Sequence, residues 1–550
     1  MIEVLDLDDL PPPLPAPNGF RYRGYQEQSF DAIEAGWLEF KRQVLVQATG
    51  TGKTEAFAYE TKRWVARGLR VLILAHAEEL LDQAARKLER STGLIAAKEK
   101  AADHASLSDM VVVASIQTLA KDSRLNGWPP DHFGLIVVDE CHRSLAASYQ
   151  KVLGYFTGKV LGVTATADRG DKQSLSKFYE RIAFQYDLRQ ACLDGWLVRP
   201  TAKTLPIKID LNGVKSSRTS EGSDYDLGEV SHRIAPFLME IARQTAIETA
   251  GRNQGVVFLP SIDTASIMAD CLRDCGMNAD YVSGQCPDRT EKMARFKAGE
   301  IGVLCNAMLL IEGFDHDAID WICVLRPTKI RSLYVQAVGR GTRPLNPLVP
   351  QLNAATSAAE RCAIIEASAK PNLLILDFLW LTEKLDLVKP AEIMARNDKV
   401  AAKMRESKKD GDLLDLEIAA ARDLLDSLEK AVAKNKKKKA RVIDPLVFAV
   451  SIKDEDLETY EPSSRWEFAP PSPEQKKYLA DLGINPEKVP NAGYASKLID
   501  KALQRKKLGL CSVAQMSFLE RLGYKDAALV SFEEARRITI DKMAHWRRKK

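Results

Sequence analysis

The chain has 550 residues, too many for a single hydrophobic core, so its length alone predicts two to four domains. Apolar residues make up 45% of the chain and charged residues 28%, which excludes a disordered or fibrous protein. The net charge of +4, from 79 basic and 75 acidic residues, is mild. Any affinity for nucleic acid must therefore come from a local basic patch.

The first residues, MIEVLDLDDL, are acidic and lack the basic start and apolar run of a signal peptide. The longest apolar stretches, such as LLILDFLWL, are far shorter than the roughly 20 residues that a membrane-spanning helix needs. Nine cysteines without regular spacing are typical of reduced thiols. Cys271 and Cys275 could share a helix face as metal ligands, but without a second pair we expect buried thiols. We expect a cytoplasmic protein with no membrane contact.

Residues 1–19, with PPPLPAP, are predicted to form an extended tail, because proline disfavours both a helix and a central strand. Short apolar runs then alternate with longer helical or loop stretches, a pattern typical of a parallel sheet covered on both faces. The first runs are QVLVQ, RVLILAH, MVVVAS, LIVVDE and KVLGVTAT, and after residue 250 follow GVVFLP, IGVLCN, WICVLRP and NLLILDF. The sequence predicts two α/β domains, at residues 20–200 and 201–382.

Charged helix formers dominate after residue 382, and residues 383–465 are predicted to be a charged helical linker region. An incomplete apolar stripe predicts one long helix there, packed on the preceding domains; it consists of Leu413, Leu414, Leu416, Ile418, Leu424, Leu425 and Leu428. Residues 466–550 contain a repeat, because SPEQKKYLADLG and SVAQMSFLERLG align at a separation of 40 residues. Each copy resembles a capped helix that ends at a Gly and is followed by a second helix. Two copies should pack as one small helical module.

The stretch QATGTGKTEAF follows an apolar run and has the residues of a phosphate-binding loop. Its glycines let the backbone turn its N–H groups toward a phosphate, Lys53 reaches the β and γ phosphates, and the Thr54 hydroxyl can bind Mg²⁺. The general motif has a Gly where this chain has Gln47, which loosens the match. The sequence predicts an ATP site at Gly50, Thr51, Gly52, Lys53 and Thr54.

The stretch LIVVDECHRS carries two possible kinds of site. Cys141 and His142 could be a nucleophile with its base, or two metal ligands. A phosphate-binding loop upstream favours the other pair: Asp139 as a ligand of Mg²⁺ and Glu140 as the group that orients and deprotonates an attacking water. Cys141 is then a small filler without a site of its own.

Several motifs occur in the order and at roughly the spacing of superfamily 2 helicases: GTGKT, DECH, TAT and QAVGRGTR. The stretches LAHAEELLDQA, IEGFD and YVQAVGRGTRPL resemble the DEAD/DEAH-type DNA helicases and the type I restriction motors. This resemblance covers about residues 20–380. It implies two tandem RecA-like domains of the P-loop NTPase fold followed by an all-helical region, with ATP and Mg²⁺ as ligands and DNA as partner.

The resemblance implies further roles at the nucleotide. RYRGYQEQ resembles an adenine-sensing Q motif, which would place Arg23 and Gln26 at the base; an ordinary helix start is the alternative. Arg340 and Arg343 would be arginine fingers from the second domain, and such an Arg is worth roughly 10³ to 10⁵ in rate. In the IEGFD stretch, Glu312 would support the loop, and the cleft would be lined by Gly313 and Asp315.

Other matching positions would couple ATP to nucleic acid. His142 is expected to span the cleft toward Gln336, and the turn from Thr164 to Thr166 would report hydrolysis. Contacts with the phosphodiester backbone of one strand are expected from Ser115, Gln117, Thr118 and Asn306, each of which could instead be a cap or turn residue.

These features predict an ATP-dependent DNA helicase or translocase, for which forked or branched DNA is the preferred substrate. From residue 472 to 550 there are 17 basic and 9 acidic residues, which favours a duplex-holding or fork-holding module over a protein-docking module or a solvated cap. An RNA helicase is one alternative. Another is a motor or clamp subunit that recruits a nuclease or replication partner through its repeats and does not unwind alone.

Overall fold

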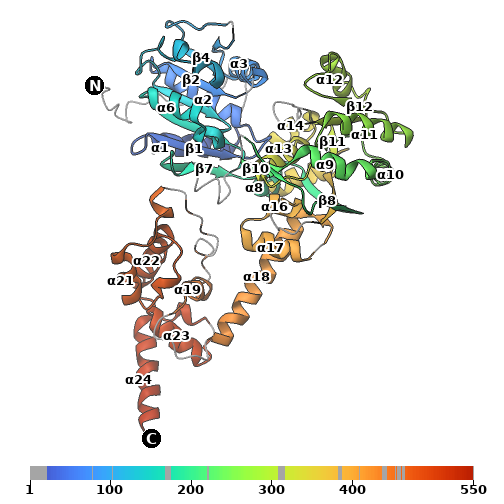
Figure 1. Ribbon diagram of the computed structural model, residues 1–550. Coiled ribbons are helices and arrows are strands. Elements are labelled where there is room, and N and C mark those ends of the chain that lie inside the picture. Colours follow the sequence, from blue (N-terminus) through green and yellow to red (C-terminus); the bar gives the residue numbers. More distant parts are fainter. Residues whose placement is uncertain are drawn as a thin grey trace. The chain divides into compact units, whose positions relative to one another are not determined.

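The computed structural model describes residues 22–548 except 77, 102, 167–174, 220–221, 308–315, 382–386, 408, 436–442, 453, 455–456, 458–459, 461, 463–464 and 525. The tail predicted for residues 1–19 lies outside this part. The chain divides into two compact units, Met1–Ala395 with Met404–Glu417, and Arg396–Lys403 with Ile418–Lys550. The first unit holds two seven-stranded sheets, and the second is helical (Figure 1).

The first sheet has the strand order β3-β4-β2-β5-β6-β1-β7, and all of its neighbouring strands are parallel. Its strands are β1 (Arg42–Gln47), β2 (Val71–Ala75), β3 (Ala97–Glu99), β4 (Val111–Ser115), β5 (Leu135–Asp139), β6 (Lys159–Thr164) and β7 (Arg181–Tyr186). Its helices are α1 (Gly24–Gly36), α2 (Lys53–Ala66), α3 (Glu78–Thr92), α4 (Ile116–Leu119), α5 (Asp122–Leu125) and α6 (Ala147–Tyr155).

Apolar side chains of the first sheet are buried on both faces. Leu45 belongs to one hydrophobic cluster, whereas its neighbours Val44 and Val46 belong to another. Successive residues of a strand point to opposite faces, so an uninterrupted apolar run is what a sheet with two covered faces requires. This confirms the parallel α/β sheet predicted from these runs.

The second sheet has the order β12-β13-β11-β14-β15-β8-β16 and is parallel except for the antiparallel pair of β8 and β16. Its strands are β8 (Arg199–Asp210), β11 (Gln254–Leu259), β12 (Ala279–Val282), β13 (Val303–Ala307), β14 (Ile319–Val324), β15 (Asn372–Leu381) and β16 (Gly411–Asp412), and β9 (Ser216–Thr219) with β10 (Gly222–Tyr225) forms a separate hairpin. Its helices are α9 (Leu227–Ile234), α10 (Leu238–Glu248), α11 (Ile262–Asp274), α12 (Arg289–Lys297), α13 (Arg331–Gly341), α14 (Val349–Ala354), α15 (Ala358–Glu366) and α16 (Pro390–Met394).

The strand order of the first sheet brings three of the predicted motifs together. Strands β5, β6 and β1 are consecutive neighbours. Because parallel strands end at the same edge of a sheet, the loop after β1, Asp139 at the end of β5 and Thr164 at the end of β6 share that edge. The chain then crosses to the second sheet through α8 (Leu188–Leu193).

The second unit contains the sequence repeat. Helices α21 (Pro473–Asp481) and α22 (Ala492–Lys507) form the first copy, and α23 (Val513–Arg521) and α24 (Phe532–Arg548) form the second. Between α16 and the repeat, the described residues also form α17 (Asp398–Ser407), α18 (Leu413–Asn435) and α19 (Pro445–Ser451). Helix α18 covers the predicted long helix. Its residue Glu417, which belongs to the first unit, is buried and accepts a hydrogen bond from Arg189 of the same unit at 2.9 Å.

Capping residues repeat with the helices. Ser472 and Ser512 each accept a hydrogen bond from the main-chain N–H group three residues later. Each helix then ends before a glycine in the left-handed conformation, with φ of 84° at Gly483 and 86° at Gly523. Both copies therefore use the same local signals to start and stop a helix.

Within the part of the chain that the structure describes, no helix has the length and apolar composition required to cross a membrane.

Close packing in the second sheet makes one glycine sensitive to substitution. A Cβ at Gly255 would lie 1.9 Å from the buried ring of Trp321, so Gly255→Ala forces the ring or the strand to move. We expect this change to lower the free energy of unfolding by about 1 to 3 kcal/mol, measured by chemical denaturation. Gly154→Ala in α6, where a Cβ would meet open space, is the matched control and should not destabilise the protein. Equal stability of the two variants would contradict the expected clash.

Candidate functional site

The loop between β1 and α2 has the backbone that phosphate binding requires. Gly50 and Gly52 have φ values of 91° and 93°, which glycine adopts without strain. Thr51 holds the turn, because its hydroxyl and its N–H group both donate to the Ala48 carbonyl, at 2.7 and 3.2 Å. Helix α2 begins directly after this turn at Lys53, so free N–H groups of the helix N-terminus face the loop.

The acidic pair lies beside this loop. Lys53 Nζ donates to Glu140 Oε1 at 3.1 Å, and Asp139 Oδ1 accepts the Glu140 N–H group at 3.0 Å. Glu140 is one of the few non-glycine residues in the left-handed region, with φ of 50°, a strained conformation typical of active sites. The local backbone therefore directs both carboxylates toward the phosphate-binding loop.

The two carboxyl groups have opposite pKa shifts. Burial, reinforced by the negative charge of Glu140, raises the pKa of Asp139 to about 6. Burial is also the largest single influence on Glu140 and opposes its ionisation, but the charges of Lys53, His142 and Arg340 and the hydrogen bond from Lys53 together lower the Glu140 pKa. Glu140 is therefore the more stable carboxylate of the pair.

Cys141 and His142 do not form a reactive pair. Burial raises the pKa of the Cys141 thiol well above its usual value, which disfavours a thiolate. Burial also lowers the pKa of His142, whose Nδ1 lies 3.6 Å from Glu140 Oε2. Among the described residues, no group of three or more His, Cys, Asp or Glu side chains could hold a metal ion.

An arginine of the second domain reaches the phosphate-binding loop. A Cβ at Gly50 would lie 3.0 Å from Arg343 Cγ and 3.4 Å from Arg343 Nε. Arg340 lies near enough to Glu140 to lower its pKa. Gly339 meets the same loop, since a Cβ there would lie 2.7 Å from Thr49. Arg343 and Arg340 thus lie beside the loop that follows β1 and beside the acidic pair at the end of β5, respectively.

The first turn of α1 is tied to the loop by hydrogen bonds. The Tyr25 hydroxyl donates to the Thr51 carbonyl at 2.7 Å, and Gln26 Nε2 donates to the same oxygen at 3.5 Å. Gln26 Oε1 accepts the Arg23 N–H group at 2.9 Å, so both ends of this amide bond to the protein. The Arg23 guanidinium lies 4.3 Å from the ring centre of Trp196.

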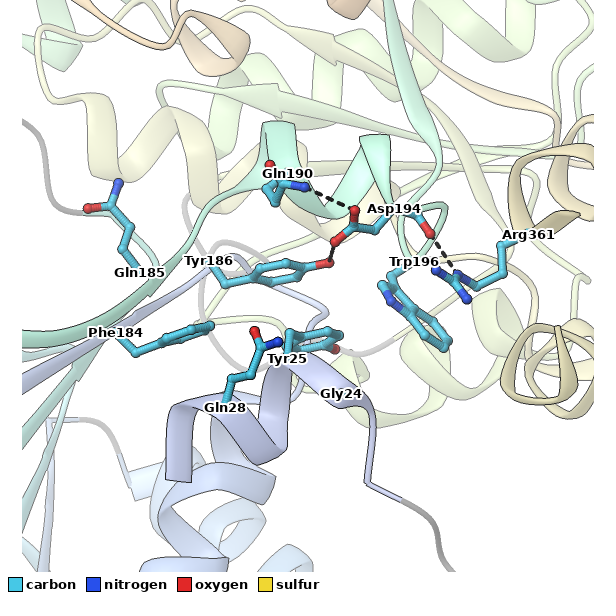
Figure 2. A pocket seen from close by; sticks show the side chains of 10 residues that line it. All are labelled: Gly24, Tyr25, Gln28, Phe184, Gln185, Tyr186, Gln190, Asp194, Trp196 and Arg361. Atoms are coloured by element: carbon cyan, nitrogen blue, oxygen red, sulfur yellow. Dashed lines mark hydrogen bonds between the residues drawn. The ribbon is translucent and has the colours of Figure 1, made fainter. Parts of the chain in front are cut away.

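A pocket of about 580 Å³ lies beside Tyr25 and contains residues of both domains (Figure 2). Tyr25 stacks on Tyr186 with ring centres 4.0 Å apart, and the Tyr186 hydroxyl donates to Asp194 Oδ2 at 2.6 Å. On the other side, Arg361 of α15 donates to the Asp194 carbonyl at 2.7 Å and lies 4.3 Å from the centre of Trp196. Two arginines, one from each domain, therefore stack on one tryptophan.

Several buried polar atoms near the site have no hydrogen-bond partner within the described residues. They are Glu140 Oε2, His142 Nε2, Thr166 Oγ1 and Gln336 Oε1. Thr164 and Thr166 form a turn in which Thr164 Oγ1 donates to the Thr166 carbonyl at 3.1 Å. Buried polar atoms normally have a partner, so these atoms fit a polar ligand such as a triphosphate with its cation and water. No hydrogen bond joins His142 to Gln336 within the described contacts.

The four residues predicted to contact nucleic acid differ in exposure. Ser115 donates to Gln117 Oε1 at 2.8 Å, and Gln117 Nε2 lies 3.1 Å from His76 Nδ1. Thr118 is 8% exposed and Asn306 is fully buried, whereas Gln117 is exposed. Gln117 has the most surface available to a strand. Glu312, Gly313 and Asp315 lie outside the described residues.

Tyr25 lies within the predicted Q-like stretch RYRGYQEQ but was not itself predicted to have a role. Sequence patterns did not point to Trp196, Arg361 or Lys87, because the site residues that they approach are far away in sequence. Lys87 on α3 is mostly buried, and burial followed by the charge of Arg343 lowers its pKa. The site thus contains one more lysine than the motifs predicted.

Two family models match the regions that form these sheets. "Type III restriction enzyme, res subunit" matches residues 19–169, and "Helicase conserved C-terminal domain" matches residues 238–344. Both models, together with the helicase relatives, support the superfamily 2 helicases of the DEAD/DEAH type, the family predicted from the motifs.

Individual relatives resemble only part of the chain. The helicase IRC3 of Saccharomyces cerevisiae is 31% identical over 346 residues, which are 58% of this chain and 49% of that protein. The EcoAI type I restriction endonuclease subunit of Escherichia coli is 30% identical over 355 residues, 58% of this chain and 44% of that subunit. The chain spans about half the length of the curated relatives it matches.

A solved fragment of the type I restriction subunit HsdR from Vibrio vulnificus aligns with a TM-score of 0.46 and 21% identity. The alignment covers 66% of this chain and 70% of that fragment.

Tyr25→Phe tests the link between the helicase Q-like segment and the loop. The change removes the hydrogen bond from Tyr25 to the Thr51 carbonyl, and such a bond is worth about 1 kcal/mol. We therefore expect KM for ATP to rise about fivefold and kcat to change little. Tyr155→Phe removes an equivalent bond to the Trp128 carbonyl, at 2.6 Å, and is the control. Steady-state ATPase measurements that give the same KM for both variants would contradict this role for Tyr25.

Proposed function

We propose that this protein is a nucleic-acid-stimulated ATPase that couples ATP hydrolysis to movement on DNA or to its unwinding, with forked or branched DNA as the preferred substrate. The observation that supports it most is the approach of Arg343, from the second domain, to Gly50 in the first. A phosphate bound at this loop would contact both domains. Closure around ATP and opening after hydrolysis would then move two domains that both grip a strand.

The phosphates of ATP would lie along the loop from Gly50 to Thr54, with the base near Arg23 and Gln26 and beside the pocket of Tyr25. Mg²⁺, held by Thr54 and Asp139, would neutralise part of the triphosphate charge. In the structure Lys53 bonds to Glu140. When Lys53 turns to the phosphates instead, Glu140 is free to orient the attacking water and accept its proton.

Charge that develops on the γ phosphate would be stabilised by Arg340 and Arg343. Gly313 and Asp315 would complete the cleft from the second domain. His142, Thr166 and Gln336, which carry unpartnered buried atoms, would respond to the γ phosphate and transmit its loss, together with Thr164, to the strand-binding side. There, Ser115, Gln117, Thr118 and Asn306 would contact or support contacts with the phosphodiester backbone.

The choice of DNA over RNA rests on the type of relative. The EcoAI subunit, 30% identical over 355 residues, is named as part of a restriction endonuclease. Of the relatives named as RNA helicases, L396 of Acanthamoeba polyphaga mimivirus is 30% identical over only 158 residues, and SrmB of Haemophilus influenzae is 23% identical. We expect single-stranded and forked DNA to raise the ATPase rate and RNA to do so weakly. Rates measured with single-stranded, duplex and forked DNA and with RNA test this. Stimulation by RNA alone would contradict the proposed substrate.

Two substitutions separate ATP binding from hydrolysis. Lys53→Ala should abolish turnover, because it removes the cation at the phosphates. Glu140→Gln should retain ATP and DNA binding but hydrolyse ATP about 10² to 10⁴ times more slowly, since the amide cannot accept the proton of water. Binding of a fluorescent nucleotide and single-turnover hydrolysis measure the two effects. Near-normal hydrolysis by Glu140→Gln would assign water activation to another residue.

His142→Ala tests coupling. The imidazole lies beside Glu140 and carries an unpartnered buried atom, so we expect the variant to bind ATP normally and to lose most of the stimulation by DNA. The ratio of ATPase rates with and without DNA is the measurement. A ratio equal to that of the unchanged protein would contradict a coupling role.

A second candidate function is supported by the EcoAI relative, which is named as a subunit. The chain would then be a motor or clamp that recruits a nuclease or replication partner through its C-terminal repeats. Strand displacement on forked DNA by the isolated protein distinguishes the two functions. Stimulated ATPase activity without displacement would favour the subunit.

A further inference from the structure

Lys370 is a buried lysine that belongs to none of the motifs described above. It precedes β15, and only 1% of its surface is exposed. Burial of an ammonium group is unfavourable unless the group is hydrogen-bonded or paired with an opposite charge. The protein must therefore compensate this charge with specific partners.

The partners of Lys370 are two main-chain carbonyl groups. Its Nζ donates to the Asp317 carbonyl at 2.6 Å and to the Arg343 carbonyl at 2.7 Å. Asp317 lies shortly after the IEGFD stretch, and Arg343 ends the GRGTR stretch. One ammonium group thus joins the main chain at Arg343, a predicted arginine finger, to the main chain at Asp317, two residues after the predicted cleft residue Asp315.

Neighbouring contacts fix the same stretch of backbone. The carbonyl of Thr342, the residue before Arg343, accepts the Val198 N–H group at 2.7 Å. Asp317 is held as well, because its carboxylate accepts the Asn346 N–H group at 2.5 Å. Consecutive carbonyls at 342 and 343 are therefore held by different parts of the chain, while Arg343 itself extends to Gly50.

Electrostatics agree with this geometry. Burial lowers the pKa of Lys370 to about 7, and the positive charge of Arg343 contributes in the same direction, against the charges of Asp320 and Asp317. The unfavourable burial of the Lys370 ammonium group must be offset by other interactions. The two hydrogen bonds to carbonyl groups offset it, since they are charge-assisted and stronger than neutral hydrogen bonds.

We propose that Lys370 is a positioning residue for ATP hydrolysis: its ammonium group fixes the main chain of Arg343 and holds the Arg343 side chain at the phosphate-binding loop, in register with the segment at Asp317. Lys370 itself does not touch the nucleotide. The inference rests on the proposed role of Arg343 as an arginine finger.

Lys370→Met removes the two bonds and keeps a side chain of similar length. Because a misplacement of about 1 Å can cost about 100-fold in rate, we expect kcat to fall by up to about 100-fold. KM for ATP and the affinity for DNA should stay within about twofold, since the first-domain loop is intact. Lys370→Arg, which restores N–H donors, should recover part of kcat.

The matched control is Lys292→Met in the same domain. Lys292 is partly buried, with 14% of its side chain exposed, and pairs with Asp280 at 3.0 Å, away from the cleft motifs. The kcat of the Lys292→Met variant should equal that of the unchanged protein. Thermal melting of all variants separates loss of fold from loss of positioning. Where Lys370→Met unfolds, Lys370→Gln, which keeps an amide donor, is measured against the same criteria.

Combination with Arg343→Ala decides between the possible failures. If Lys370 acts through Arg343, the double variant should be no slower than Arg343→Ala alone. Normal kcat in a folded Lys370→Met protein, with Arg343→Ala impaired, would overturn the inference and leave the proposed function intact. Normal kcat in Arg343→Ala would instead overturn the finger role. A further loss in the double variant would show that Lys370 acts independently of Arg343, which would also overturn the inference.

Discussion

The contact between Arg343 and Gly50 joins two domains at the point where a phosphate is expected. Gly50 meets two requirements there, because its φ of 91° is unfavourable for other residues and because a Cβ would lie only 3.0 Å from Arg343 Cγ. The sequence motif explains the first requirement. The second follows from the approach of the other domain. Neither domain alone therefore contains the complete set of charged groups.

Charge balance explains why such a site would favour closure around a triphosphate. Burial lowers the pKa of Arg343 to about 10, and Lys87 is also shifted toward its neutral form. The pKa of Asp139 is shifted in the opposite direction and is raised to about 6. Buried cations and a buried acid both cost free energy without partners. A triphosphate would place negative charge beside Arg343 and Lys87, and its divalent cation would place positive charge beside Asp139. Binding of this ligand would therefore reduce the cost of burying all three side chains.

Local patterns predicted the strands that are buried on both faces and the motifs that follow them. All nine apolar runs are strands, as a parallel sheet covered on both faces requires. Strands β7 and β8 were missed because polar residues interrupt both, so neither contains an uninterrupted apolar run of the kind that marked the other strands. Trp196, Arg361 and Lys370 were missed for a different reason. Their partners are far away in sequence, and nothing in their neighbours signals the contact.

The C-terminal repeat separates what sequence encodes locally from what depends on packing. In both copies the glutamine of the capping box reaches the next helix: Gln475 Nε2 donates to the Ala492 carbonyl at 3.0 Å and Gln515 Nε2 to the Phe532 carbonyl at 3.3 Å. Yet Ala492 is buried, whereas Phe532 is 44% exposed. Identical caps therefore fix the same helix pair in each copy, while the side chains between the caps decide which faces are covered. The side chains that differ between the copies, and not the shared capping residues, therefore set the surface that each copy presents.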